Sequence, residues 1–174
     1  MSKKKFKEEF IGWFKAFLIA VLIALFLRSF VFATSIVDGD SMFPALENGE
    51  RVIFNKAVYI IGEPAREDIV IIQRPLKNYV KRIVGLPGET IEVKDHILYI
   101  NEKAYQQSFL SEDMQKRTGN FGPIEIPEES YFVLGDNRAR SKDSRNGLGF
   151  INKQEIIGRS EFIIYPFSEW SFTR

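Results

Sequence analysis

The segment Phe10–Ala33 reads FIGWFKAFLIAVLIALFLRSFVFA and divides the 174-residue chain into two unlike parts. Its two charged residues, Lys15 and Arg28, lie near its ends, where long cationic side chains can reach polar surroundings. At about 1.5 Å of rise per residue, a helix of this length spans roughly 36 Å, which exceeds a hydrocarbon core of about 30 Å. We therefore expect residues 10–33 to form a single transmembrane anchor.

The charges beside this segment predict its orientation. Residues 3–7 contain four lysines, and the positive-inside rule then places residues 1–9 in the cytoplasm. Residues 34–174 follow on the outer side of the cell membrane. An alternative is a cleavable signal peptide that ends at Val31-Phe32-Ala33, although Arg28 interrupts the approach to that cleavage site. Either interpretation places residues 34–174 on the outer side of the membrane.

The composition of residues 34–174 indicates one compact, turn-rich domain. This part has 18 basic and 21 acidic residues, all seven prolines, and eleven of the twelve glycines. The near-neutral balance argues against a protein held on nucleic acid by overall charge. The chain has no cysteine, which excludes disulfides, thiolate nucleophiles and iron–sulfur clusters, and its single histidine, His96, leaves little for a metal site. We expect no cofactor and no nucleic-acid partner.

The fold predicted for this domain is mainly β, with coiled antiparallel sheets or a partly open barrel. Short β-type runs alternate with glycine and proline, and a tight turn is expected at Asn101. The predicted strands are Arg51–Asn55, Ile69–Gln73, Tyr79–Val84, Thr90–Lys94, His96–Ile100, Tyr131–Leu134 and Gly158–Tyr165. One short helix is predicted at Lys153–Ile157, with Asn152 as its N-cap.

Three segments place reactive or charged side chains beside tight turns. The first, Val37–Pro44, reads VDGDSMFP. Gly39 permits a positive φ and Pro44 stops regular structure, so the hydroxyl and the amide of Ser41 can point to one place. Taken alone, this pattern also fits an ordinary turn serine.

The second segment, Tyr79–Glu89, reads YVKRIVGLPGE. Strand alternation puts Lys81 and Arg82 on opposite faces, so one of these cations must point toward the apolar face. Burial lowers the pKa of a lysine, and a neutral lysine can act as a general base; the nearby Arg82 is expected to lower this pKa further. The alternative is a solvated cation on an edge strand.

The third segment, Gly135–Arg145, reads GDNRARSKDSR. Asp143 and Arg145 are spaced to form an ion pair, and Asn137 can brace the loop. As an isolated pattern this is an ordinary surface loop, but it could also support a serine–lysine pair.

The ordered set of anchor, G-D-S-M-x-P, Y-V-K-R-x-x-G-x-P-G-E and G-D-N-R-x-x-S-x-D-S-R resembles bacterial type I signal peptidases, in particular the Gram-positive branch. The resemblance covers nearly the whole chain. It implies a membrane-anchored serine endopeptidase with the signal peptidase fold, which removes signal peptides from translocated precursors after small residues at −1 and −3. Its partners would be such precursors and membrane lipid.

The resemblance also implies a role for individual residues. Ser41 matches the nucleophile and Lys81 the general base, and Ser141 matches the hydroxyl that orients the base amine. The remaining matches are a buried supporting pair, Asp143 and Arg145, and pocket residues for the substrate, Val37, Met42 and Val80. Some relatives have an oxyanion-binding serine where this chain has Gly39, which leaves the Ser41 amide as the clear oxyanion donor.

Two other classes of protein remain as alternatives. A self-cleaving repressor-like peptidase uses the same pair of residues, but it predicts an N-terminal DNA-binding domain and no transmembrane span. A membrane-tethered binding module without catalysis would use Ser41 and Lys81 only as turn and surface residues. The catalytic interpretation requires the side chains of Ser41 and Lys81 to meet in a buried site, whereas the binding module does not.

Overall fold

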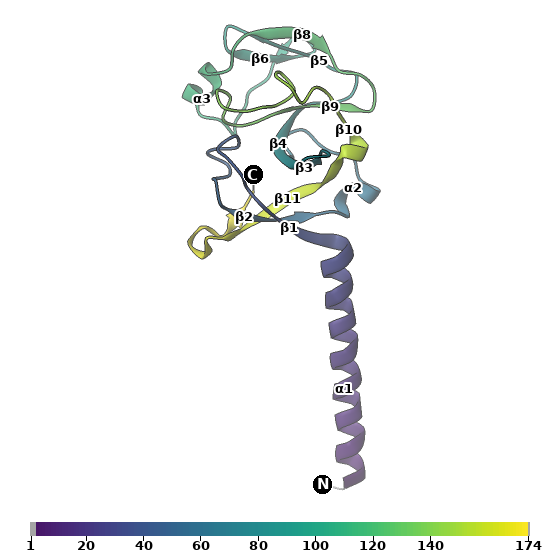
Figure 1. The fold of residues 1–174 in the computed structure, drawn as a ribbon. Coiled ribbons are helices and arrows are strands. Elements are labelled where there is room, and N and C mark those ends of the chain that lie inside the picture. The colour runs from purple at the N-terminus through teal and green to yellow at the C-terminus, as the bar shows by residue number, and fades with distance from the viewer. Residues whose placement is uncertain (1–2, 174) are drawn as a thin grey trace.

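The computed structural model describes residues 3–173 and contains one long N-terminal helix that leads into a β-rich domain (Figure 1). Helix α1 (Lys3–Phe26) continues into a π-helical turn, η1 (Leu27–Val31). The stretch Glu9–Val31 has a mean hydropathy of 2.5 and none of it is buried in the protein, so it is long and apolar enough to cross a membrane. Residues 1 and 2 of the expected 1–9 segment lie outside the described residues.

The helical part ends two residues earlier than the predicted anchor of residues 10–33. Phe32 and Ala33 are extended and belong to the first strand of the domain. The backbone N–H of Lys56 donates to the Val31 carbonyl at 2.7 Å, and the Lys56 ammonium donates to the Ser29 carbonyl at 2.7 Å. These bonds satisfy carbonyl groups at the end of the helix and attach it to the domain.

Beyond the helix, the domain consists mainly of antiparallel strands. The strands are β1 (Phe32–Ile36), β2 (Arg51–Asn55), β3 (Ile69–Gln73), β4 (Asn78–Gly85), β5 (Thr90–Lys94), β6 (Ile97–Ile100), β7 (Lys103–Ala104), β8 (Phe121–Glu125), β9 (Ser130–Leu134), β10 (Ile151–Asn152), β11 (Ile156–Tyr165) and β12 (Ser171–Phe172). The short helices are α2 (Val58–Ile61), α3 (Glu112–Lys116), η2 (Lys153–Glu155) and η3 (Phe167–Glu169).

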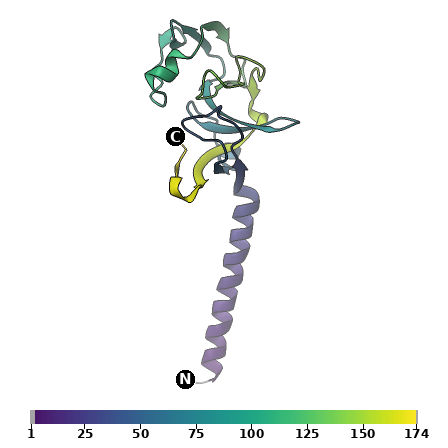
Figure 2. The same cartoon turned by 60° about the vertical axis from the view of Figure 1, so that its left-hand side comes forward.

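The strands form two open sheets, which confirms the predicted mainly β fold. The larger sheet has the order β1-β2-β11-β3-β4-β9-β10, with β12 added beside β11, and the smaller sheet has the order β7-β6-β5-β8. The two views together show the smaller sheet at the end of the domain far from the helix, whereas η3 lies at the end from which the helix leaves (Figures 1 and 2).

All seven predicted strands are present, with small differences at their ends. The turn at Asn101 is confirmed, because Asn101 and Glu102 both have positive φ, of 50° and 65°. His96, predicted as the first residue of a strand, instead lies in the preceding turn with φ of 68°. The predicted helix at Lys153–Ile157 is wrong beyond its first turn, because only η2 is helical and Ile156 already begins β11.

The core consists of three groups of buried apolar side chains, and β4 contributes to each of them. The first group includes Val70, Ile72, Ile83 and Val133; the second includes Val84, Ile91, Phe132 and Leu134; the third includes Val37, Met42, Leu46, Val52 and Ile69, with Val80 packed against it. Strand β4 is paired with β3 on one side and, over its second half, with β9 on the other. Its side chains are buried on both faces of the sheet, since the adjacent residues Ile83 and Val84 belong to different core groups.

Candidate active site

Ser41 lies in the loop that joins β1 to β2, and hydrogen bonds within the loop fix its shape. The Val37 amide donates to the Glu50 carbonyl at 2.8 Å. Gly39 has φ of 89°, as the sequence predicts, and its amide donates to Asn48 Oδ1 at 2.8 Å. The loop therefore holds Ser41 half-buried at the start of a tight turn.

Lys81 reaches Ser41 from the middle of β4. Its Nζ lies 2.7 Å from Ser41 Oγ and 2.6 Å from the Val80 carbonyl oxygen, to which it donates. The side chain is only 2% exposed. This distance allows a proton to pass directly from the serine hydroxyl to a neutral amine.

Burial is the main cause of an unusual pKa for Lys81. Desolvation disfavours the ammonium form and, together with the positive charge of Lys77, lowers the pKa to about 8; Asp143 and Asp136 oppose this effect. The ordinary value is about 10.4. A substantial fraction of the amine is consequently neutral at slightly alkaline pH, as a general base requires.

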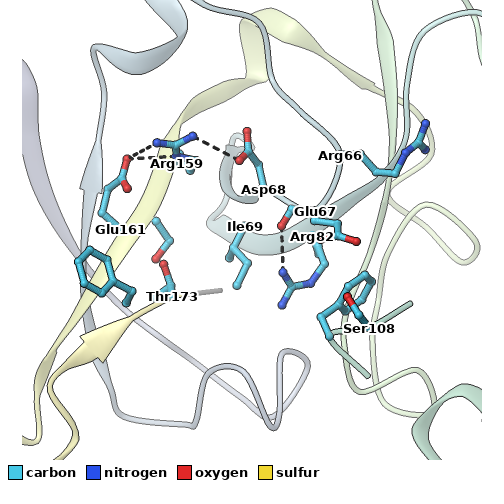
Figure 3. Close-up of a pocket in the computed structure, with 12 residues that line it drawn as sticks. Arg66, Glu67, Asp68, Ile69, Arg82, Ser108, Arg159, Glu161 and Thr173 are labelled. Carbon is cyan, nitrogen blue, oxygen red and sulfur yellow. Dashed lines mark hydrogen bonds and ion pairs between the residues drawn. The ribbon is translucent and has the colours of Figure 1, made fainter. Parts of the chain in front are cut away.

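Arg82 is also buried, but it does not face the Ser41–Lys81 pair. It lies on the opposite face of β4, where its Nε and Nη2 donate to the two carboxylate oxygens of Asp136 at 2.9 and 2.7 Å. Figure 3 shows its guanidinium beside Glu67, whose carbonyl accepts a further hydrogen bond at 2.9 Å. The prediction that Arg82 lowers the pKa of Lys81 is therefore wrong, because Arg82 is paired with Asp136. The neighbouring charge that lowers this pKa is that of Lys77.

The cavity beside Arg82 is lined by charged side chains that pair with one another. In Figure 3, Arg159 lies between Asp68 and Glu161, and it bonds to them at 3.4 and 3.0 Å. The Tyr59 hydroxyl also donates to Asp68 at 2.7 Å. Each of these charged groups has a partner of opposite charge or a hydrogen bond, which is the arrangement that buried ions require for stability.

The third segment, Gly135–Arg145, contacts the loop of Ser41 directly. The Asn137 amide donates to the Ser41 carbonyl at 3.1 Å. Gly135 lies so close to both segments that a Cβ at this position would meet Ser141 Oγ at 2.2 Å and the Ser41 carbonyl oxygen at 2.4 Å. This close approach requires glycine at position 135 and brings Ser141 beside the site.

Asp143 and Arg145 form the predicted ion pair. The Arg145 guanidinium donates to both carboxylate oxygens of Asp143, at 2.9 and 2.8 Å, and the Gly135 amide donates to the same carboxylate at 3.1 Å. Burial raises the pKa of Asp143, but Arg145 and the hydrogen bonds outweigh burial and leave the pKa lowered. The carboxylate therefore remains charged and fixes the loop.

Ser141 lies in this loop and is buried, but its hydroxyl does not bond to the Lys81 amine in this structure. Nζ instead donates to the Val80 carbonyl. The buried Ser141 hydroxyl has no hydrogen-bond partner among residues 3–173. Its predicted role in orienting the amine remains a prediction.

The pair opens into a small cavity of about 220 Å³. The predicted pocket residues Val37, Met42 and Val80 all line it, together with residues of the segments 35–42 and 77–81 and with Arg140 and Lys142. Its size suits small side chains. Within residues 3–173, no three histidine, aspartate or glutamate side chains are grouped to hold a metal ion.

Sequence reasoning missed Arg138, which supports the third segment from behind. Its guanidinium is buried and donates to the Gly135 carbonyl at 3.1 Å, to Thr118 Oγ1 at 3.2 Å and to Gln107 Oε1 at 2.5 Å. These bonds connect the loop to the region around α3. The arginine is visible in the motif G-D-N-R, but nothing in the sequence points to partners 20 and 31 residues away.

Comparison with known proteins identifies close relatives. The family model "Signal peptidase, peptidase S26" matches residues 10–165. The chain is 49% identical to signal peptidase I of Bacillus licheniformis over 172 residues, covering 94% of this chain and 92% of the relative. It is 48% identical to signal peptidase I S of Bacillus subtilis (strain 168) over 177 residues, covering 97% and 95%.

A similar fold is present in a crystal structure of a signal peptidase I from Enterococcus faecalis V583. The two structures superpose with a TM-score of 0.51 at 35% sequence identity. The similarity covers 57% of this chain and 97% of that structure's chain.

Replacing Gly135 tests the contact between the third segment and the loop of Ser41. We expect Gly135→Ala to lower kcat/KM for peptide cleavage by at least about tenfold, because a 1 Å displacement of a catalytic group can cost that much or more. The matched control is Gly119→Ala, where no atom lies within 4 Å of the added Cβ. Wild-type kinetics for Gly135→Ala, measured with a fluorogenic peptide, would contradict the proposed packing.

Proposed function

Since the chain belongs to the signal peptidase family, peptidase S26, and is a signal peptidase that removes signal peptides from precursor proteins, we propose that it does so by acyl transfer with Ser41 as nucleophile and Lys81 as general base. The single observation that carries this proposal is the 2.7 Å separation of Lys81 Nζ and Ser41 Oγ in a buried site. Conservation of the fold alone would not assign these roles.

In the first half of the reaction, neutral Lys81 accepts the hydroxyl proton of Ser41 as Oγ attacks the carbonyl carbon of the scissile peptide bond. The tetrahedral intermediate collapses with cleavage of the C–N bond, and the lysine ammonium donates its proton to the leaving amine. An ester between Ser41 and the signal peptide remains. In the second half, Lys81 takes a proton from water as the water oxygen attacks the ester carbonyl. The ester C–O bond then breaks, the Lys81 ammonium returns the proton to Ser41 Oγ, and the signal peptide leaves with a free carboxyl end.

The oxyanion of the tetrahedral intermediate needs a donor that is in place before the reaction. The Ser41 amide donates no hydrogen bond to any other of residues 3–173, and Gly39 offers no hydroxyl for this task. We infer that the Ser41 amide binds the oxyanion. One such donor typically contributes about 3–4 kcal/mol to transition-state stabilisation.

The free backbone edges beside the cavity support binding of an extended substrate. Strand β9 pairs with β4 only from Arg82 onward, so the backbone of residues 78–81 has no strand neighbour on that side. A precursor segment can add there as a further strand and place small side chains against Val37, Met42 and Val80. This arrangement supports cleavage after small residues at −1 and −3.

The apolar helix fits membrane anchoring, and exposed aromatic residues support contact with lipid. Phe167, Trp170 and Phe172 are 77%, 67% and 60% exposed. They belong to the region of η3 and β12, and η3 lies at the end of the domain from which the helix leaves (Figures 1 and 2). Aromatic side chains favour the membrane–water interface. We infer that this end of the domain touches the membrane and that the domain is extracytoplasmic.

Ser41→Ala and Lys81→Ala test the proposed roles. Each is expected to reduce cleavage of a signal-peptide-bearing precursor by about a thousandfold or more, since the two residues act as a unit. The mass of the precursor after incubation measures the reaction, and Lys94→Ala, in the distant small sheet, is the matched control. Retained cleavage by either variant, in protein that remains folded, would reject the pair.

The pH dependence of kcat/KM follows from the lowered pKa of Lys81. Only the neutral amine accepts the serine proton, and a pKa of about 8 leaves it mostly protonated below that pH. We expect kcat/KM to fall about tenfold for each pH unit below about 7 and to reach a plateau above about 9. An acidic optimum would contradict a lysine base.

The proposed orientation can be tested by labelling cysteines, because the chain contains none of its own. We expect a membrane-impermeant maleimide to label Glu102→Cys in intact cells. It should label Lys7→Cys only after the membrane has been permeabilised. The reverse pattern would place the catalytic domain in the cytoplasm.

A further inference from the structure

A second lysine lies at the mouth of the cavity and shares an aromatic ring with the base. Lys77 is in the turn between β3 and β4, is exposed, and lines the same cavity as Ser41 and Lys81. Its Nζ lies 5.0 Å from the centre of the Tyr79 ring, and the Nζ of Lys81 lies 6.0 Å from the same point. The sum of these distances, 11.0 Å, is the largest separation that the two nitrogens can have.

Several of the charged side chains around Lys81 are neutralised by ion pairs with other residues. Asp143 is paired with Arg145, and Asp136 with Arg82. At the mouth of the cavity, Arg140 pairs with Asp40 at 3.5 Å, and Asp38 and Lys142 are further lining residues. Lys77 forms no ion pair with any of the described residues 3–173, so no carboxylate in this part of the chain neutralises its charge.

We propose that Lys77 is a positioning residue for the cleavage reaction: its positive charge, beside the same Tyr79 ring as Lys81, disfavours protonation of the base and extends cleavage to lower pH. This inference rests on the proposed role of Lys81. It follows from Coulomb's law, because a fixed positive charge nearby makes it less favourable to create a second one. The same effect contributes to the lowered pKa of Lys81, where Lys77 acts in the same direction as burial.

The expected size of the effect is modest and measurable. At the largest possible separation of the two charges, about 11 Å, effective dielectric constants between about 20 and 80 correspond to a change of roughly 0.3 to 1 pH unit. Because Lys77 is exposed, salt should weaken the effect, since the screening length falls from about 10 Å at 0.1 M to about 3 Å at 1 M. A role in packing would not depend on salt in this way.

The test is a set of pH profiles of kcat/KM for the full-length protein in detergent micelles, with a fluorogenic signal-peptide substrate that has no charged residue near its cleavage site. At low salt, Lys77→Gln should shift the acidic limb of the profile to higher pH by about 0.3 to 1 unit. At a fixed pH on that limb, kcat/KM should therefore be about two- to tenfold lower than in the wild type. Lys77→Glu should move it further, and Lys77→Arg should keep it in place. At 1 M salt, the profiles of wild type and Lys77→Gln should converge.

Lys94→Glu is the matched control for a change of net charge, because Lys94 is an exposed lysine of the distant small sheet. Its acidic limb should coincide with that of the wild type. If the limb is unmoved in Lys77→Gln and Lys77→Glu, or if both variants lose the same factor at every pH and salt concentration, the inference is wrong. The Lys81→Ala variant distinguishes failure of the Lys77 hypothesis from failure of the proposed general base. If Lys81→Ala is inactive and the Lys77 variants leave the acidic limb unmoved, only the role of Lys77 is overturned. If Lys81→Ala is active, Lys81 is not the general base.

Discussion

Removing the Lys81 amine from water is the constraint on which the rest of the structure depends. Strand β4 places two adjacent cations in the interior, with Lys81 2% and Arg82 1% exposed. An arginine cannot lose its proton in a protein, so Arg82 requires the buried carboxylate of Asp136. Lys81 hydrogen-bonds to a serine hydroxyl and a backbone carbonyl, with no carboxylate in the pair. The same burial therefore produces an ion pair on one face of the strand and, on the other, an amine whose pKa is lowered to about 8.

The loop of residues 135–145 connects these two faces. Asp136 neutralises Arg82, the Asn137 amide holds the carbonyl of Ser41, and the Asp143 carboxylate closes the loop on the Gly135 amide. Both aspartates raise the pKa of Lys81, which works against a neutral base. Their pairing with arginines limits this effect. The loop can thus carry two negative charges close to the base while burial still determines its protonation state.

The sequence predicted the strands and the members of the site better than the contacts between them. Ile69–Gln73 was predicted to the residue, because a continuous apolar run is typical of a strand buried on both faces. His96 was assigned to a strand although it lies in a turn, because the two positive φ values of this turn fall on Asp95 and His96 rather than on glycine. The bonds from Arg138 to Gln107 and Thr118 join segments far apart in the chain, and no local pattern encodes them. Periodicity reports which face a residue occupies, whereas such contacts arise only when the segments pack.

The proposed role of general base explains why position 81 holds a lysine and not an arginine. A general base in a site without histidine must lose its proton near physiological pH, and the one histidine, His96, lies exposed in the turn between β5 and β6. Lysine is a compact point charge whose pKa responds strongly to desolvation, while the guanidinium of arginine remains protonated even when buried. Packing of the domain around Lys81, which is only 2% exposed, supplies that desolvation, and the loop of Ser41 supplies a hydroxyl in place of a counter-ion. Adding a carboxylate beside the amine would stabilise the ammonium ion, so the site would gain a salt bridge and the proposed general base would stay protonated.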